Sequence, residues 1–177
     1  MAERSFNDWV NADGLRVRFG TGESLVTRGG ELPFSNGIHT VEIELLASDL
    51  KAFDDATDPT TVLDWNTRIP EGAWIKSAEL EVLTAFAGAT ATLDIGLIDA
   101  DDQLAAFTDH DDDGIDSAIA VTAIDAIGDV ITCDGALIGT TLTASGTGSG
   151  GFLITAEAGT ATFTAGEARL RIEWYMP

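Results

Sequence analysis

The chain has very few cysteines and very few cations. Cys133 is the one cysteine among 177 residues, so an intrachain disulfide is excluded and packing must hold the fold. Lysine and arginine number 9 against 30 aspartates and glutamates, for a formal net charge of −21. That charge repels phosphate backbones and anionic lipids, so we expect no nucleic-acid or membrane partner. No apolar run approaches the roughly 20 residues of a membrane helix, and residues 1–20 lack a signal-peptide core.

Cations are missing altogether from the middle of the chain. Between Lys76 and Arg169 there is no lysine or arginine, while the same interval holds 16 acids. The first 30 residues are balanced instead, and they include Arg4, Arg16 and Arg18. One end of the molecule is therefore suited to an acidic partner, and the rest is suited to facing solvent.

Motifs that carry catalysis are also lacking. The chain has no Gly-x-Ser-x-Gly elbow and no phosphate-binding P-loop. Glu79 and Glu81 share one face of a predicted strand, as exposed strand residues commonly do. His39 and His110 are too isolated to form a zinc site with Cys133, which we expect to be a small buried side chain. The sequence therefore predicts a protein that is not an enzyme and that needs no cofactor.

What the chain has in abundance is alternation of apolar and polar residues. Residues 69–98 contain two such runs, separated by a break at Gly88, and the simplest interpretation is an antiparallel pair of strands sharing a core. Similar runs at 41–45 and 168–175 add further strands. Roughly eight or nine short strands separated by glycine turns predict a mainly β chain, a two-sheet β-sandwich with a jelly roll as the favoured topology.

Two segments depart from the strand pattern. Asp116 is a plausible cap for one short helix over 117–127, ended by Gly128, although its Val and Ile content also suits a strand. Residues 1–13 have no period, and Phe6, Trp9 and Val10 have no local partner. We interpret 1–13 as an N-terminal arm that docks on its own domain or on a neighbour, and 14–177 as a single β-sandwich domain.

Alternating carboxylates precede a glycine at Asp109-x-Asp111-x-Asp113-Gly114. Carboxylates that converge in this way suit a hard cation such as calcium. Ala120 stands where an EF-hand needs a bidentate glutamate, so an EF-hand is excluded. Two interpretations remain: a looser calcium site made of Asp109, Asp111, Asp113 and Asp116, or a solvated acidic turn.

Four segments of the chain resemble a known group of proteins. They are IPEGAWIKSAELEVLTAF (69–86), ATLDIGLIDADD (91–102), DHDDDGID (109–116) and TCDGALIGTTL (132–142). Together they look like small structural proteins of tailed phages that infect aquatic bacteria. These are similar to capsid cement, or decoration, proteins, and the resemblance covers residues 65–175.

The resemblance implies a function as well as a fold. Such proteins are jelly-roll sandwiches that sit as homotrimers on the outside of the capsid and clamp neighbouring major capsid subunits. It therefore implies a virion protein, assembled in the host cytoplasm, whose partner is the major capsid protein. Arg4, Trp9, Arg16 and Arg18 are then the candidate capsid-facing residues, because an acidic domain needs its few cations where it meets another protein.

An alternative is a tail or fibre module, or a calcium-dependent carbohydrate-binding β-sandwich. In that case the Asp109–Asp116 loop would hold the calcium. The aromatic residues Trp65, Trp74, Trp174 and Tyr175 would provide a platform on which a sugar stacks.

Overall fold

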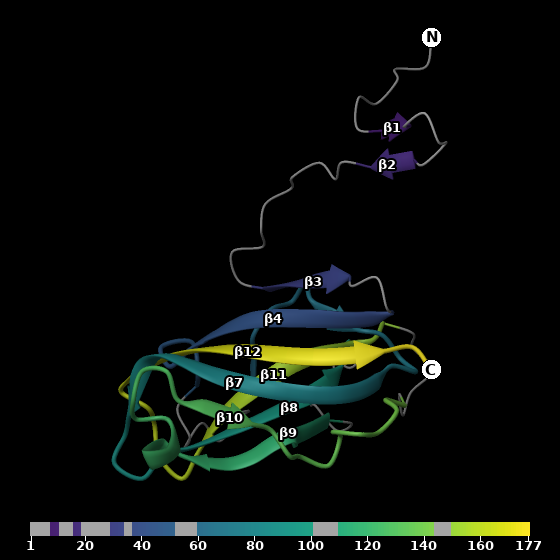
Figure 1. Ribbon diagram of the computed structural model, residues 1–177. Coiled ribbons are helices and arrows are strands. Elements are labelled where there is room, and N and C mark those ends of the chain that lie inside the picture. Colours follow the sequence, from purple (N-terminus) through teal and green to yellow (C-terminus); the bar gives the residue numbers. More distant parts are fainter. Residues whose placement is uncertain are drawn as a thin grey trace.

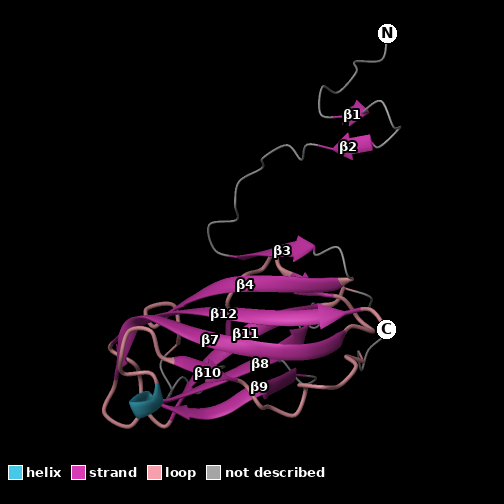
Figure 2. Ribbon diagram, viewed as in Figure 1, coloured by secondary structure: helices cyan, strands magenta, loops and turns pink. Residues whose placement is uncertain are grey.

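The computed structural model describes residues 8–10, 16–18, 29–33, 37–51, 60–100, 110–143 and 150–177. Strands dominate these residues, and a short 3-10 turn, η2 (Val121–Ala123), follows the ninth strand (Figure 2). The strands are β1 (Asp8–Val10), β2 (Arg16–Arg18), β3 (Gly29–Pro33), β4 (Ile38–Leu46), β5 (Thr61–Val62), β6 (Arg68–Ile69), β7 (Trp74–Ala87), β8 (Thr92–Asp99), β9 (His110–Ala120), β10 (Val130–Thr132), β11 (Phe152–Gly159) and β12 (Ala165–Tyr175).

Ten of these strands build two antiparallel sheets that pack against each other (Figure 1). Sheet one has the order β10-β7-β12-β4-β3, and sheet two has the order β5-β11-β8-β9 with β6 also paired to β11. We number the strands of the jelly roll in chain order, with β4 as the first, β5 and β6 together as the second, and β7 to β12 as the third to the eighth. Starting from β4, sheet one then has the order first, eighth, third, sixth. Sheet two then runs second, seventh, fourth, fifth. This is the jelly-roll order, with β3 added outside β4, so the predicted fold class is confirmed.

The core lies between the two sheets and follows directly from the period of two in the sequence. In β12 the residues Ala168, Leu170, Ile172 and Trp174 are all buried, and the residues between them face outward. Leu93, Ile95 and Leu97 of β8 meet them from sheet two. Each large aliphatic side chain buried in this way contributes about 1.5–3 kcal/mol to the free energy of unfolding, and this packing holds the fold without a disulfide.

The two alternating runs of residues 69–98 share this core, but they are not paired with each other. β7 lies between β12 and β10 in sheet one, while β8 lies between β11 and β9 in sheet two. The prediction that these two runs form an antiparallel pair is therefore wrong. Small and polar residues from Gly88 to Ala91 carry the chain from one sheet across to the other, which side-chain alternation alone cannot distinguish from a tight turn.

The helix expected after Asp116 is also wrong. β9 continues to Ala120, and only η2 has helical geometry within the segment 117–127. Asp116 is a buried strand residue rather than a helix cap. The β-branched residues of this segment favour the strand, as does the neighbouring edge of β8. Among the described residues, no helix has the length and apolarity to cross a membrane.

β1 and β2 form a separate two-stranded antiparallel sheet, drawn apart from the sandwich in Figure 1. The register places Trp9 opposite Val17, and Arg16 and Arg18 opposite Val10 and Asp8. The division into an arm over 1–13 and a domain over 14–177 stays a prediction, since residues 1–7, 11–15 and 19–28 lie outside the described ones.

Candidate functional site

The candidate capsid-facing residues fall on the small N-terminal sheet. Trp9 lies on β1, and Arg16 and Arg18 lie on β2, so strand pairing brings these three into one six-residue unit. Arg4 lies outside the described residues. An isolated two-stranded sheet is only marginally stable in water, so this unit gains from a partner surface.

A second group of cations, which sequence reasoning missed as a group, lies on the outer face of sheet one. The Nζ atom of Lys76 lies 2.7 Å from Oε2 of Glu173, and Nη2 of Arg171 lies 3.1 Å from Oε1 of the same carboxylate. Nη2 of Arg169 lies 3.8 Å from Oε2 of Glu81. Alternation already placed Glu81, Arg169, Arg171 and Glu173 outward, but it assigned Lys76 to the face of Ala78, and the alternation of β7 shifts between these two residues. The meeting of these side chains depends on the pairing of β12 with β7, which the sequence does not reveal.

These ion pairs neutralise much of the face that carries them. The hydrogen bond from Lys76 is the main reason that the pKa of Glu173 is lowered, and the charges of Lys76 and Arg171 add to it. In the register, Glu42 and Glu79 flank Arg171 from the neighbouring strands β4 and β7. The cations of sheet one are thus matched by acids of the same domain. In the register of the N-terminal sheet, Arg16 lies opposite Val10 and Arg18 lies opposite Asp8.

The acidic motif lies on β9, at the free edge of sheet two, and it is part of a large bulge. Leu93 and Leu97 of β8 pair with Ile119 and Asp111 of β9, so three residues of β8 face seven of β9. β9 therefore carries four extra residues over this stretch. Gly96 allows the bulge of β9 to lie close to β8, because a Cβ at this position would lie 2.0 Å from the carbonyl oxygen of Asp111.

The loop after β10 holds the bulge from the other side. The backbone N–H of Gly135 donates to the carbonyl of Ile115 at 2.9 Å, and that of Leu137 donates to the carbonyl of Gly114 at 2.8 Å. Ile115 is fully buried in the core. The bulge is thus a fixed structure that presents the acidic residues at the sheet edge.

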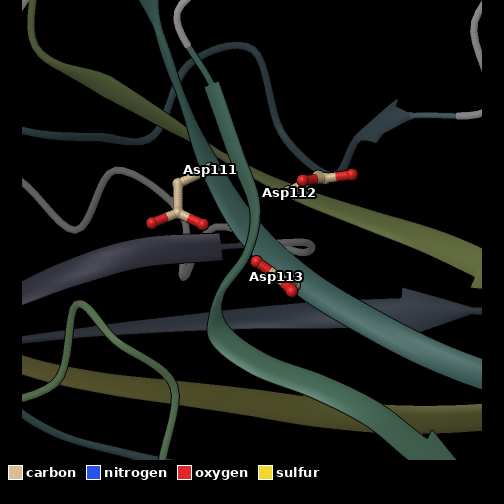
Figure 3. Close-up of side chains that lie close together, drawn as sticks. All are labelled: Asp111, Asp112 and Asp113. Atoms are coloured by element: carbon tan, nitrogen blue, oxygen red, sulfur yellow. The ribbon is translucent and has the colours of Figure 1, made fainter.

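Three consecutive carboxylates gather on this bulge. One oxygen from each of Asp111, Asp112 and Asp113 lies within 4.8 Å of the others (Figure 3). Such a group offers oxygen ligands to a hard cation. Of the predicted ligands, Asp111 and Asp113 belong to the group, and Asp109 lies outside the described residues. The sequence motif did not include Asp112, because a calcium loop takes its ligands from every second residue. In the bulge of β9, consecutive residues lie close together instead.

Asp116, the fourth predicted ligand, has other partners. Its side chain is 6% exposed, and its Oδ1 accepts the backbone N–H of Ser117 at 2.8 Å. The thiol of Cys133 also bonds to this carboxyl. Burial raises the pKa of Asp116, and the nearby acid Asp134 adds to the rise. Burial likewise raises the pKa of Cys133 to about 12, so its thiol is neutral.

The aromatic residues do not form a single stacking platform. Trp174 is buried in the core and stacks on His39 with ring centroids 4.2 Å apart. Trp74 and Tyr175 are tilted neighbours at 6.4 Å, and Trp65 is 51% exposed on a loop. Trp174 is therefore a core residue and offers no surface on which a sugar could stack.

Strand order and core together define a jelly-roll β-sandwich, and a chain of one solved phage capsid structure shares this architecture. A chain of the structure titled "Cyanophage Pam1 capsid asymmetric unit" aligns with a TM-score of 0.52 and 16% identity, over 89% of this chain and 99% of that chain. A chain of "Acidic stable capsid structure of Helicobacter pylori bacteriophage KHP30" aligns with a TM-score of 0.42 and 15% identity, over 84% and 94%. The first likeness establishes a shared fold. No family model and no curated protein matches the sequence.

Proposed function

We propose that this chain is a structural protein of a tailed-phage virion. In this proposal it binds the outside of the capsid as a homotrimer and strengthens the shell by linking major capsid subunits, with no catalytic step. The observation that carries the proposal is the fold shared with a chain of a cyanophage capsid structure, which extends over 89% of this chain and 99% of that one. The resemblance of residues 65–175 to cement proteins points to the same class.

The distribution of charge supports a particular docking side. The sandwich is acidic, and its cations on sheet one are matched by glutamates. Arg16, Arg18 and Trp9 lie on a two-stranded sheet outside both sandwich sheets, where one acid, Asp8, lies opposite Arg18 in the register. Cations that meet an acidic capsid surface add attraction, and Trp9 adds apolar contact area. Three such units on one trimer would bind together, so modest contacts add up to a stable grip.

The proposal is tested on the parent particle. Cryo-electron microscopy of purified virions should place this chain on the outer shell, and capsids assembled without it should rupture at lower internal pressure. Binding of the purified chain to bare capsids should fall at least about tenfold in the double variant Arg16→Glu, Arg18→Glu. Lys51→Glu, Arg68→Glu, which changes the net charge by the same amount at exposed positions of the sandwich, is the matched control and should bind like the wild type. A chain located off the shell, with no affinity for capsids, would refute the proposal.

A calcium-dependent binding module is the second candidate, favoured by the three neighbouring carboxylates Asp111, Asp112 and Asp113. Calorimetric titration with calcium, followed by a glycan screen, separates the two candidates. Saturable heat that disappears in Asp111→Asn, together with calcium-dependent glycan binding, would favour this module. If neither the saturable heat nor calcium-dependent glycan binding is observed, the capsid proposal remains the better account.

A further inference from the structure

β10 lies at an open edge of sheet one, where its backbone can accept another strand. It pairs with β7 and with no other described strand. On either side of it, the N–H of Val82 donates to the carbonyl of Asp129 at 2.9 Å, and the N–H of Cys133 donates to β7 at 3.0 Å. Because the residues of an antiparallel strand bond alternately to one side and the other, the N–H and C=O groups of Val130 and Thr132 point away from β7.

The turn before β10 presents apolar side chains on a fixed backbone. Ile127 is 74% exposed, and Val130, at the start of the strand, is 57% exposed. The N–H of Asp129 donates to the carbonyl of Ala126 at 3.3 Å, and the N–H of Ala126 donates to Oδ2 of Asp129 at 3.0 Å. Gly128, whose φ is 87°, bonds to β7 at 2.9 Å. A partner that covers this turn would therefore bury two apolar side chains without having to order the backbone.

β10 lacks the features by which sheets protect an open edge from pairing. Such edges are commonly bulged or carry charged residues, lysine above all, or proline. β9, at one edge of sheet two, has both the bulge and the charges of Asp111, Asp112 and Asp113. β10 pairs with β7 in regular register, and no lysine or proline occurs in residues 127–133. Its edge is thus suited to pairing with another strand.

The charges around β10 favour one partner over two others. Asp125, Asp129 and Asp134 flank the strand, and residues 125–134 contain no cation. Pairing with β10 of another copy would bring two such sets of aspartates together, and an acidic capsid surface would repel them as well. β3 is the opposite edge of sheet one, and residues 16–28, which precede it in the chain, hold three arginines and one glutamate. Charge complementarity therefore favours the β3 edge of another copy.

We propose that β10 and the turn before it bind the β3 edge of a second copy of this chain, so that sheet one joins copies head to tail. This inference rests on the proposed function, from which it takes the trimer. A ring of three needs a contact between two different surfaces, because a surface that binds itself closes at two copies. Backbone bonds and the burial of Ile127 and Val130 hold the copies together, and charge selects which edges meet.

Two substitutions in the full chain test the proposed contact. Proline is tolerated on an edge strand where its missing N–H would face solvent, so Val130→Pro removes the outward donor and keeps the bonds to β7. Ile127→Asp places a charge in the contact, and it decides the test if Val130→Pro does not fold, because Ile127 is 74% exposed. Light scattering after size exclusion should give three times 18.5 kDa for the wild type and 18.5 kDa for each variant. Met176→Asp, at a side chain 53% exposed after β12, is the matched control and should stay a trimer.

Cysteine cross-linking tests which edges meet. Val130→Cys, combined in turn with a cysteine at Gly30, Glu31 or Leu32 of β3, should give disulfide-linked chains on oxidation for at least one of the three combinations. Cys133 does not interfere, because it is buried. Val130→Cys alone should give no linked chains. Linked dimers of that single variant would overturn the proposal, since they would show β10 pairing with itself.

The outcomes separate this proposal from the proposed function. A wild-type trimer that Ile127→Asp leaves intact would overturn the β10 contact and leave the capsid role standing. A wild-type chain that is monomeric and has no affinity for capsids would overturn both. Dissociation of Ile127→Asp and Met176→Asp alike would also overturn the β10 contact, because added charge anywhere on the chain would then be sufficient.

Discussion

Gly96 lets the bulge of β9 lie directly against β8. A Cβ at this position would lie 2.0 Å from the carbonyl oxygen of Asp111 and 2.4 Å from the carbonyl carbon of Asp112, and backbone atoms of a paired strand cannot move away cheaply. Gly96→Ala should therefore lower the free energy of unfolding by about 1–3 kcal/mol, measured by urea denaturation.

Gly159→Ala is the matched comparison for Gly96→Ala. A Cβ at Gly159 would meet Oγ1 of Thr92 and Oδ2 of Asp94, which are side-chain atoms that can turn aside. We expect a clearly smaller loss of stability there. Equal losses in the two variants would mean that backbone contact at the bulge is not what makes Gly96 necessary.

Cys133 should be chemically silent in the folded chain. Its side chain is 3% exposed, and its pKa of about 12 leaves almost no thiolate, which is the reactive form. A thiol-specific reagent such as Ellman's reagent should detect no thiol in the native protein at mildly alkaline pH, and one thiol per chain after denaturation. Rapid labelling of the native chain, or a dimer that a reductant dissociates, would contradict this expectation.

At the scale of elements, the ion pairs on the outer face of sheet one should make the stability of the fold depend on pH. The lowered pKa of Glu173, which results mainly from the bond to Lys76, means that its charge stabilises the fold above the ordinary value of 4.5. That stabilisation is lost as the pH falls through the folded pKa. Glu173→Gln should cost about 0.5–1 kcal/mol near neutral pH, and the difference should vanish in acid. Thermal unfolding over a pH series measures it.

Glu71→Gln is the control for Glu173→Gln, because Glu71 is exposed in the turn before β7. Its unfolding should follow the wild type at every pH, within about 0.5 kcal/mol. A loss in Glu173→Gln that persists unchanged in acid would show that the side chain stabilises by packing rather than by charge.

The strands differ in how far the sequence alone determined them. β12 was predicted with its buried face, since Ala168, Leu170, Ile172 and Trp174 alternate without interruption. The neighbouring strands of β7 and β8 were not predicted, because alternation determines which face of a strand is buried and not which strand pairs with it. The helix after Asp116 was mispredicted because short apolar runs suit either period, and pairing with β8 decided the outcome.

The candidate sites were limited by the same lack of tertiary information. The sequence identified the acidic motif, but the group of Asp111, Asp112 and Asp113 results from the four extra residues of β9. The diversion of Asp116 to Ser117 and Cys133 follows from burial that local sequence does not reveal. Pairing of β1 with β2, which places Trp9 opposite Val17, likewise depends on the register of two separate segments.

At the scale of the whole molecule, net charge should make the proposed assembly between copies and the proposed docking on a capsid respond to salt in opposite ways. Each 18.5 kDa chain has a formal charge of −21, so the proposed homotrimer would form against mutual repulsion. Salt screens that repulsion, since the Debye length falls from about 30 Å at 0.01 M to about 8 Å at 0.15 M. The proposed contact of Arg16 and Arg18 with an acidic capsid is an attraction, and the same screening weakens it.

We therefore expect the trimer to become more stable, and capsid binding weaker, as salt rises over this range. Light scattering after size exclusion should show a mass three times that of the 18.5 kDa chain, persisting to lower protein concentration at the higher salt. Co-sedimentation with bare capsids should show affinity falling at least severalfold over the same range. This fall should be absent in the double variant Arg16→Glu, Arg18→Glu, in which salt screens a repulsion instead of an attraction. If the trimer instead dissociates as salt rises, attraction between the cationic N-terminal sheet of one copy and the acidic sandwich of another must hold it together, and those arginines would not be free for the capsid.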